Sequence, residues 1–215
     1  MRFKILVLFV VLGFMAACGG APSPPAETPP AEPAAPAEPS ADVDGPGYTE
    51  TPALDKIPEG TIKGMANGRP FEATGVYFEP SFGKWRLVIG DKPLEEPTDI
   101  VVGAQAVNMD IPEPPAAGKT WTRTMKYGDG YFQVKKTDDP ENTTSWNADN
   151  AWVLELTKWD VQPYDENGSL FQQAGTASGK VYVAYKGSMD IKDSWVAGTF
   201  TDVPVRYMGK PELEY

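Results

Sequence analysis

Two absences restrict the chemistry available to this chain. Its 215 residues include no histidine and one cysteine, Cys18. Ser-His-Asp and Cys-His nucleophiles need an imidazole base, and zinc, haem and copper sites depend on imidazole or thiolate ligands. These arrangements are therefore excluded, and we expect a protein that is not an enzyme and binds no cofactor.

No specific motif in the sequence indicates catalysis through other groups. Paired carboxylates hydrolyse glycosides when one is protonated and the other ionised, but no spacing singles out a pair among the 23 Asp and Glu residues of 56–215. Ser81 and Lys84 have a Ser-x-x-Lys spacing, in a predicted hairpin loop rather than a helix. A carboxylate-based glycoside hydrolase stays the second alternative.

Calcium is the metal that the remaining residue types could bind, because it prefers carboxylate, amide and carbonyl oxygens. Asp138, Asp139 and Glu141 lie in one loop beside Asn142, and a second acidic loop spans 165–169. Neither follows the EF-hand pattern, and polar turns between strands have this composition without any ion. We predict no metal site and keep Asp138, Asp139 and Glu141 as calcium candidates.

Three aromatic residues are candidates for stacking on a ligand. Trp146 lies in a polar run, 142–150, and an exposed tryptophan among amides is typical of sugar stacking. Tyr77 and Trp85 belong to a second aromatic group that also contains Phe78 and Phe82. Packing into the core or over the end of a sheet would explain the same residues.

The first 18 residues form a signal and attachment pattern. Arg2 and Lys4 flank the start of thirteen apolar or glycine residues, 5–17. That length fits a secretory signal peptide and is shorter than the about 20 residues needed to span a bilayer. An ordinary secretory signal and an uncleaved anchor are the alternatives to the interpretation that follows.

Met15-Ala16-Ala17-Cys18 resembles the lipobox of bacterial lipoproteins, with Met15 where leucine is usual. The resemblance implies a signal peptide over 1–17, cleavage between Ala17 and Cys18, and acylation of Cys18, which attaches the chain to a membrane. Several acyl chains on one cysteine anchor stably. Gly19 after the cysteine implies an outer-membrane lipoprotein, facing the periplasm or the cell surface.

A tether follows, over residues 18–55. From position 19 it holds ten of the 22 prolines and seven acidic residues, with no Lys or Arg. Such a segment cannot bury a core, and its prolines favour extended polyproline II at about 3.1 Å per residue. We expect a disordered spacer rich in Pro, Ala and Glu.

Residues 56–215 are long enough for one domain with a core of its own. Short apolar runs rich in Val, Tyr, Trp and Thr, separated by Gly and Pro, predict an all-β fold. Asn67-Gly68, Asp129-Gly130 and Asn167-Gly168 are hairpin turn signals. We predict a single antiparallel β-sandwich, with a closed β-barrel as the alternative, and the expected strands are 60–66, 69–79, 84–90, 99–110, 119–126, 130–137, 151–161, 174–186 and 194–207.

The domain is acidic, with 23 acidic and 17 basic residues between positions 56 and 215. Nucleic acids and anionic lipid head groups attract clustered positive charge. We therefore expect no nucleic-acid partner. The membrane contact is expected to be made through the lipid on Cys18.

The domain opens with Gly64-Met65-Ala66-Asn67-Gly68-Arg69-Pro70-Phe71 and ends near Gly198-Thr199-Phe200-Thr201-Asp202-Val203-Pro204. Together with Trp85, Leu87 and Ile89, these segments resemble uncharacterised β-rich bacterial lipoprotein domains. The resemblance implies fold and location only. The expected function is a non-catalytic structural or protein-interaction role at the cell envelope, and the alternative is a module that binds carbohydrate or another small ligand.

Acylation of Cys18 is directly testable. Cells that express the full chain should incorporate radiolabelled palmitate into it, and the mass of the mature protein should exceed that of the cleaved polypeptide by its acyl groups. An unmodified Cys18 in the mature protein would contradict the lipoprotein interpretation.

Overall fold

The structure is a computed structural model that describes residues 43–93 and 103–215. Ala17, Cys18, the signal peptide and residues 18–42 of the tether lie outside the described residues. Within the described ranges the chain contains eleven strands, one short 3-10 helix and no α-helix. No helix in these ranges has the length and hydrophobicity needed to cross a bilayer.

The elements follow one another along the chain as a 3-10 helix, η1 (Leu54–Lys56), and then the strands β1 (Lys63–Ala66), β2 (Arg69–Glu72), β3 (Gly75–Ser81), β4 (Lys84–Gly90), β5 (Ala106–Ile111), β6 (Thr120–Tyr127), β7 (Gly130–Lys135), β8 (Thr143–Trp146), β9 (Asp149–Val161), β10 (Phe171–Tyr185) and β11 (Ser194–Met208).

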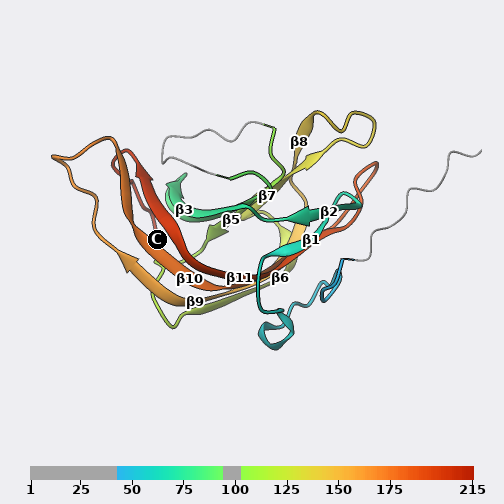
Figure 1. Cartoon of the computed structure of the whole chain (residues 1–215), viewed down its shortest axis with the longest axis horizontal. Coiled ribbons are helices and arrows are strands. Elements are labelled where there is room, and N and C mark those ends of the chain that lie inside the picture. The colour runs from blue at the N-terminus through green and yellow to red at the C-terminus, as the bar shows by residue number, and fades with distance from the viewer. Residues whose placement is uncertain (1–42, 94–102) are drawn as a thin grey trace, which may run out of the picture. The chain divides into compact units, whose positions relative to one another are not determined.

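The strands form one sheet in the order β6-β9-β10-β11-β3-β4-β5-β7-β8, with β1 paired to β11 and β2 to β1. All the pairings are antiparallel except that of β11 with β3, which is parallel. The sheet curls into a half-barrel in which the long strands β9–β11 lie below β3, β5 and β7 (Figure 1). The prediction of an all-β fold is confirmed. The fold is one mixed, curled sheet and not clearly a two-sheet antiparallel sandwich.

The curl depends on irregular positions in the long strands. β10 has register shifts between Gln173 and Gly175 and between Ala177 and Gly179. At Gly175, φ is +155° and a Cβ atom would lie 1.9 Å from the backbone oxygen of Asp160. Bulges and glycines of this kind bend strands and increase their twist, so β9 and β10 can turn together around the core.

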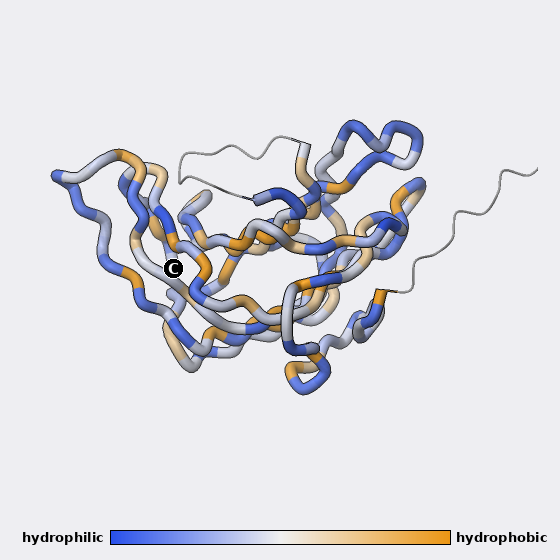
Figure 2. The backbone as a smooth tube through the Cα atoms, in the orientation of Figure 1, coloured by the Kyte–Doolittle hydropathy of each residue, from blue (hydrophilic) through white to orange (hydrophobic). Residues whose placement is uncertain are grey.

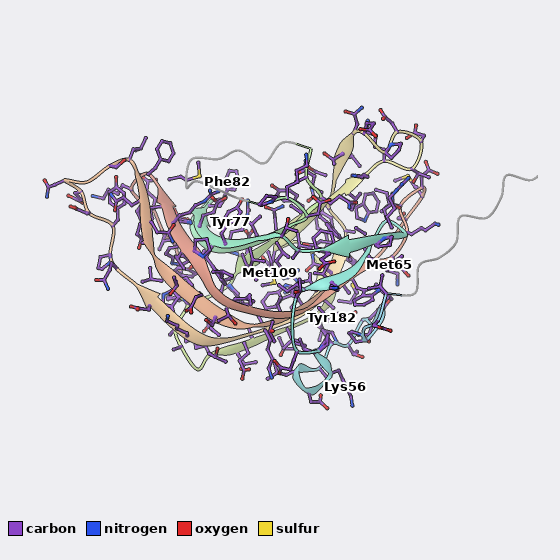
Figure 3. The ribbon with its side chains drawn as sticks, in the orientation of Figure 1. Lys56, Met65, Tyr77, Phe82, Met109 and Tyr182 are labelled. Atoms are coloured by element: carbon purple, nitrogen blue, oxygen red, sulfur yellow. The ribbon has the colours of Figure 1, made fainter. Side chains whose placement is uncertain are left out.

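The concave side of the curl holds the main core. It includes Phe78, Leu87, Met109, Phe132 and Leu154, all fully buried. Figure 3 shows Met109 between the upper and lower strands, and Figure 2 shows a long hydrophilic stretch in the loop between β7 and β8. Burial of this apolar surface is the main favourable term for the fold.

A second, smaller cluster covers the convex side of β9–β11. Tyr182 and Trp195 stack at 6.5 Å between ring centroids, and Val153, Ala184 and Ala197 complete the buried surface of the strands. Residues 43–57, here called the strap, lie over it. The strap contributes Val43, Tyr48, Leu54 and Ile57.

Hydrogen bonds and an ion pair hold the strap in place. The Thr49 amide donates to the Tyr182 hydroxyl at 2.8 Å, and that hydroxyl donates to the Gly47 carbonyl at 2.9 Å. Glu50 pairs with Lys186 at 2.8 Å. Residues 43–55, which the sequence analysis assigns to the disordered tether, therefore belong to the packed part of the chain.

Most predicted strands are present, although β1 and β5 begin later than predicted and residues 99–102 of the predicted strand 99–110 lie outside the described residues. The segment 69–79 divides into β2 and β3, and β8 was not predicted.

The three predicted turn signals have different outcomes. Asn67-Gly68 forms the expected hairpin turn, with φ of 49° and 75°. Asp129-Gly130 does not join a hairpin, because β6 pairs with β9 and β7 with β5 and β8. Asn167-Gly168 lies in a longer β9–β10 connection, 162–170.

The Tyr182 hydroxyl gives a test of the strap. Tyr182→Phe removes both hydrogen bonds to the strap backbone, and we expect a loss of about 1–3 kcal/mol in the free energy of unfolding. Hydrogen exchange at the Thr49 amide should become at least about tenfold faster.

Tyr207→Phe is the matched control. The Tyr207 hydroxyl donates to the Gln162 carbonyl at 3.1 Å, away from the strap. This variant should lose stability without selectively accelerating exchange at Thr49. Unchanged Thr49 exchange in Tyr182→Phe would show that the hydroxyl does not hold the strap.

Candidate functional site

The candidate site is a groove on the outer face of β3, β4, β5, β7 and β11, away from the strap. In these strands alternate side chains point into the core and outward. Leu87, Met109 and Phe132 point inward, so the residues between them point outward. The groove encloses about 260 Å³, and its described lining is Gly75, Tyr77, Glu79, Arg86, Val88, Gly90, Lys92, Ala104, Ala106, Asn108, Tyr131, Gln133, Arg206 and Met208.

A ladder of alternating charges crosses four strands: Arg206, Glu79 and Arg86 line the groove, and Asp110 pairs with Arg86 outside the lining. Glu79 is opposite Arg86, and Arg86 is opposite Asp110. Two nitrogens of Arg206 donate to the same Glu79 oxygen, Oε2, at 3.0 and 2.8 Å. Arg86 Nε donates to Asp110 Oδ1 at 2.7 Å. Because both guanidinium groups are largely buried, their charges need these partners.

Two tyrosines flank the ladder. The Arg206 guanidinium lies 4.0 Å from the centroid of the Tyr77 ring, and the Arg86 guanidinium lies 5.5 Å from that of Tyr131. Both distances are within the range of cation–π attraction. The arginines therefore fix the positions of the two rings as well as the charges beside them.

The floor of the groove is low because its residues are small. Gly75, Gly90 and Ala106 are consecutive cross-strand partners, and Gln133 of β7 continues the row. Glycine and alanine leave room above the sheet where larger side chains would stand. The register of four strands thus creates the hollow.

Amide side chains add hydrogen-bonding groups. Asn108 donates through Nδ2 to the Ala106 carbonyl at 3.3 Å, and Gln133 donates through Nε2 to the Thr143 hydroxyl at 2.8 Å. These bonds orient both amides from below and from the side. The groove consequently presents aromatic rings, amides and paired charges in fixed positions, which is the composition of a selective site for a small polar molecule.

Tyr77 stays protonated in this environment. Burial raises the pKa of Tyr77 to about 12, with a further contribution from Glu79, against the opposing effect of Arg206. Its hydroxyl is therefore a hydrogen-bonding group at neutral pH and not a tyrosinate nucleophile.

The three stacking candidates do not share a site. Tyr77 lines the groove, but Trp85 is buried in the core, where its ring centroid lies 5.3 Å from that of Trp159 in an edge-to-face arrangement. Trp146 lies on β8 and donates through Nε1 to the Lys186 carbonyl at 3.0 Å. It lines a different hollow with Met189 and Ile191.

The other candidate residues are dispersed. Among the described residues, no group of three or more His, Cys, Asp or Glu side chains could hold a metal ion. Asp138 and Glu141 are exposed, and Asp139 accepts a 2.6 Å hydrogen bond from Asn142. Lys84 lies 3.4 Å from Asp129, so its ammonium is engaged with a carboxylate and not with Ser81.

Sequence reasoning found Tyr77 and missed the other groove residues. Alternation would have placed Arg86, Asp110 and Arg206 outward on their strands. Arg86 meets Asp110 across the antiparallel pair β4–β5, but Arg206 joins them only through the parallel contact between Val205 and Phe78, which pairs β11 with β3. No local pattern marks that pairing.

Comparison with known proteins gives no relative from which a function could be transferred. No protein-family model, curated protein or solved structure matches the chain.

The raised pKa of Tyr77 predicts a loss of stability at alkaline pH. The pKa of this hydroxyl is near 10 in the unfolded chain and about 12 in the folded chain. Between these two pH values the folded state binds more protons than the unfolded state, so stability falls as the pH rises. Urea denaturation between about pH 9 and 11.5 should show a smaller fall for Tyr77→Phe than for the natural chain. Equal falls would contradict the burial of this hydroxyl.

Proposed function

We propose that the chain is a lipid-anchored protein of the bacterial cell envelope that acts by binding and not by catalysis, and that its outer groove binds a neutral carbohydrate. The observation that carries the proposal is the groove with Tyr77 and Tyr131 beside a floor of glycine and alanine. Aromatic rings contact the apolar faces of sugar rings, and planar polar side chains hydrogen-bond their hydroxyl groups.

The charge pattern favours a neutral ligand over an ionic one. Arg206 is paired with Glu79 and Arg86 with Asp110. An anionic ligand would have to compete with these carboxylates for the guanidinium groups. A cationic ligand would have to compete with the guanidinium groups for the carboxylates. Hydroxyl groups can instead donate to the carboxylate oxygens and accept from N–H groups while the pairs stay intact.

The size of the groove fits one sugar unit. Its volume of about 260 Å³ is just below the range of about 300–1,000 Å³ typical of sites for drug-sized molecules. Recognition of hydroxyl groups by buried polar side chains gives strong selectivity, because an analogue without the hydroxyl leaves those side chains unpaired.

The location remains part of the proposal. The lipobox resemblance at Cys18 supports attachment to the outer membrane, and the proline-rich segment supports a spacer between membrane and groove. We do not propose hydrolysis of the bound glycan, because Glu79, the carboxylate in the described lining of the groove, is held in an ion pair with Arg206, and the neighbouring Asp110 is held by Arg86.

Tyr131→Ala tests the carbohydrate site. Calorimetric titration with glucose, galactose, mannose and N-acetylglucosamine should identify a sugar that binds the natural chain. Loss of the Tyr131 ring should reduce the affinity for that sugar by about tenfold or more.

Tyr127→Ala is the control, because Tyr127 is an exposed tyrosine of β6 outside the groove. It should leave the affinity unchanged. The proposal fails if none of the four sugars binds, or if the two variants behave alike.

A second candidate function is contact with another envelope protein, the role expected first from the sequence. It is favoured by Met189, which is 89% exposed at the edge of the hollow that contains Trp146 and Ile191. Methionine and aromatic residues are enriched at protein interfaces relative to the rest of the surface. A photocrosslinker at position 189 should then capture one specific membrane or periplasmic protein in intact cells, and a crosslinker at exposed Tyr127 should not.

A further inference from the structure

Phe82 occupies an unusual backbone position beside the groove. It lies with Gly83 at the tip of the β3–β4 hairpin, between the paired residues Ser81 and Lys84. Its φ is +48°, that of Gly83 is +79°, and its side chain is 93% exposed. Two-residue hairpin turns with positive φ at both positions strongly prefer Asn, Asp or Gly at the first one.

The other left-handed residues show what is normal in this chain. Among the described residues, five non-glycine residues have positive φ, and three of them are Asn or Asp. Phe82 and Met189 are the exceptions, and both are almost fully exposed. A bulky side chain in this conformation costs stability. The Phe82 ring gains little burial in return, so packing does not explain its presence.

Two observations place Phe82 next to the groove. Its ring centroid lies 5.6 Å from the Arg86 guanidinium, the same group that lies 5.5 Å from Tyr131. A second hollow, of about 310 Å³, is lined by 80–83 and by 208–212 and Glu214. Met208 lines both this hollow and the groove, so the two are adjacent, and Figure 3 shows Tyr77 and Phe82 at the same end of the upper strands.

The hairpin tip is held in place from behind. The Glu214 amide donates to the Gly83 carbonyl at 2.7 Å, and the Trp85 amide donates to the Tyr215 hydroxyl at 2.8 Å. The turn therefore presents the ring from a fixed base. A fixed aromatic side chain binds with a smaller loss of conformational entropy than a mobile one.

We infer that Phe82 forms a second subsite of the groove, and that the ligand is accordingly an oligosaccharide of at least two linked sugars. One unit occupies the groove between Tyr77 and Tyr131, and the next lies over the second hollow with a face against the Phe82 ring. This inference rests on the proposed carbohydrate function. It adds that the site selects oligosaccharides over single sugars.

The test compares monosaccharides with their disaccharides on the full chain. The probes are glucose with cellobiose and maltose, and N-acetylglucosamine with its β-1,4-linked dimer. The natural chain should bind one disaccharide about tenfold more tightly than the corresponding monosaccharide. Phe82→Asn should remove this gain and leave the monosaccharide affinity unchanged.

Asparagine is chosen because it suits the left-handed turn, so Phe82→Asn should raise the melting temperature or leave it unchanged. Met189→Asn is the matched control, since Met189 has φ of +55° and is equally exposed but lines neither the groove nor the second hollow. It should keep the disaccharide gain.

The possible outcomes separate the two proposals. Monosaccharide binding without a disaccharide gain, or a gain that persists in Phe82→Asn, overturns the second subsite and leaves the carbohydrate function standing. If none of these sugars binds, and galactose and mannose do not bind either, the carbohydrate function fails and the subsite fails with it.

Discussion

Burial of the central strands on both faces is the constraint on which the rest of the structure depends. Val181–Tyr185 of β10 is buried at every position, so both faces of the sheet must be covered there. The inner face is covered because the sheet curls over it, and the outer face is covered by the strap. A flat sheet, or a fold that begins at residue 56, would leave one set of aromatic side chains in water.

The strap also determines which part of the outer face stays uncovered. It covers the outer face of β9–β11 and does not line the groove on β3, β4, β5 and β7. That part of the outer face is shielded by charged pairs instead of apolar contacts. Since a half-buried charge is tolerated only beside its partner, the alternating ladder from Arg206 to Asp110 both stabilises the four strands and keeps a polar hollow next to them.

The sequence predicted the features that depend on neighbouring residues. Strand composition identified most strands, and Asn67-Gly68 identified a hairpin, because both signals are local. Pairings between distant segments were missed: Asp129-Gly130 has the same turn chemistry, yet β6 turns to β9. The uninterrupted apolar run at 181–185 was a usable sign of two-sided burial, whereas the groove required the contact of β11 with β3, which no local pattern encodes.

We propose binding without reaction because the polar groups of the groove are already engaged with one another. General acid–base catalysis needs a group that changes its protonation near the working pH. Burial raises the pKa of Tyr77 to about 12, so its hydroxyl stays protonated near neutral pH, and the ladder carboxylates are paired with guanidinium groups. A ligand that enters meets donors and acceptors already oriented by the sheet, and such preorganisation favours the bound ground state. Interactions that are equally strong in the ground state and the transition state give affinity without rate acceleration, and this is the basis on which we propose a binding role for the groove.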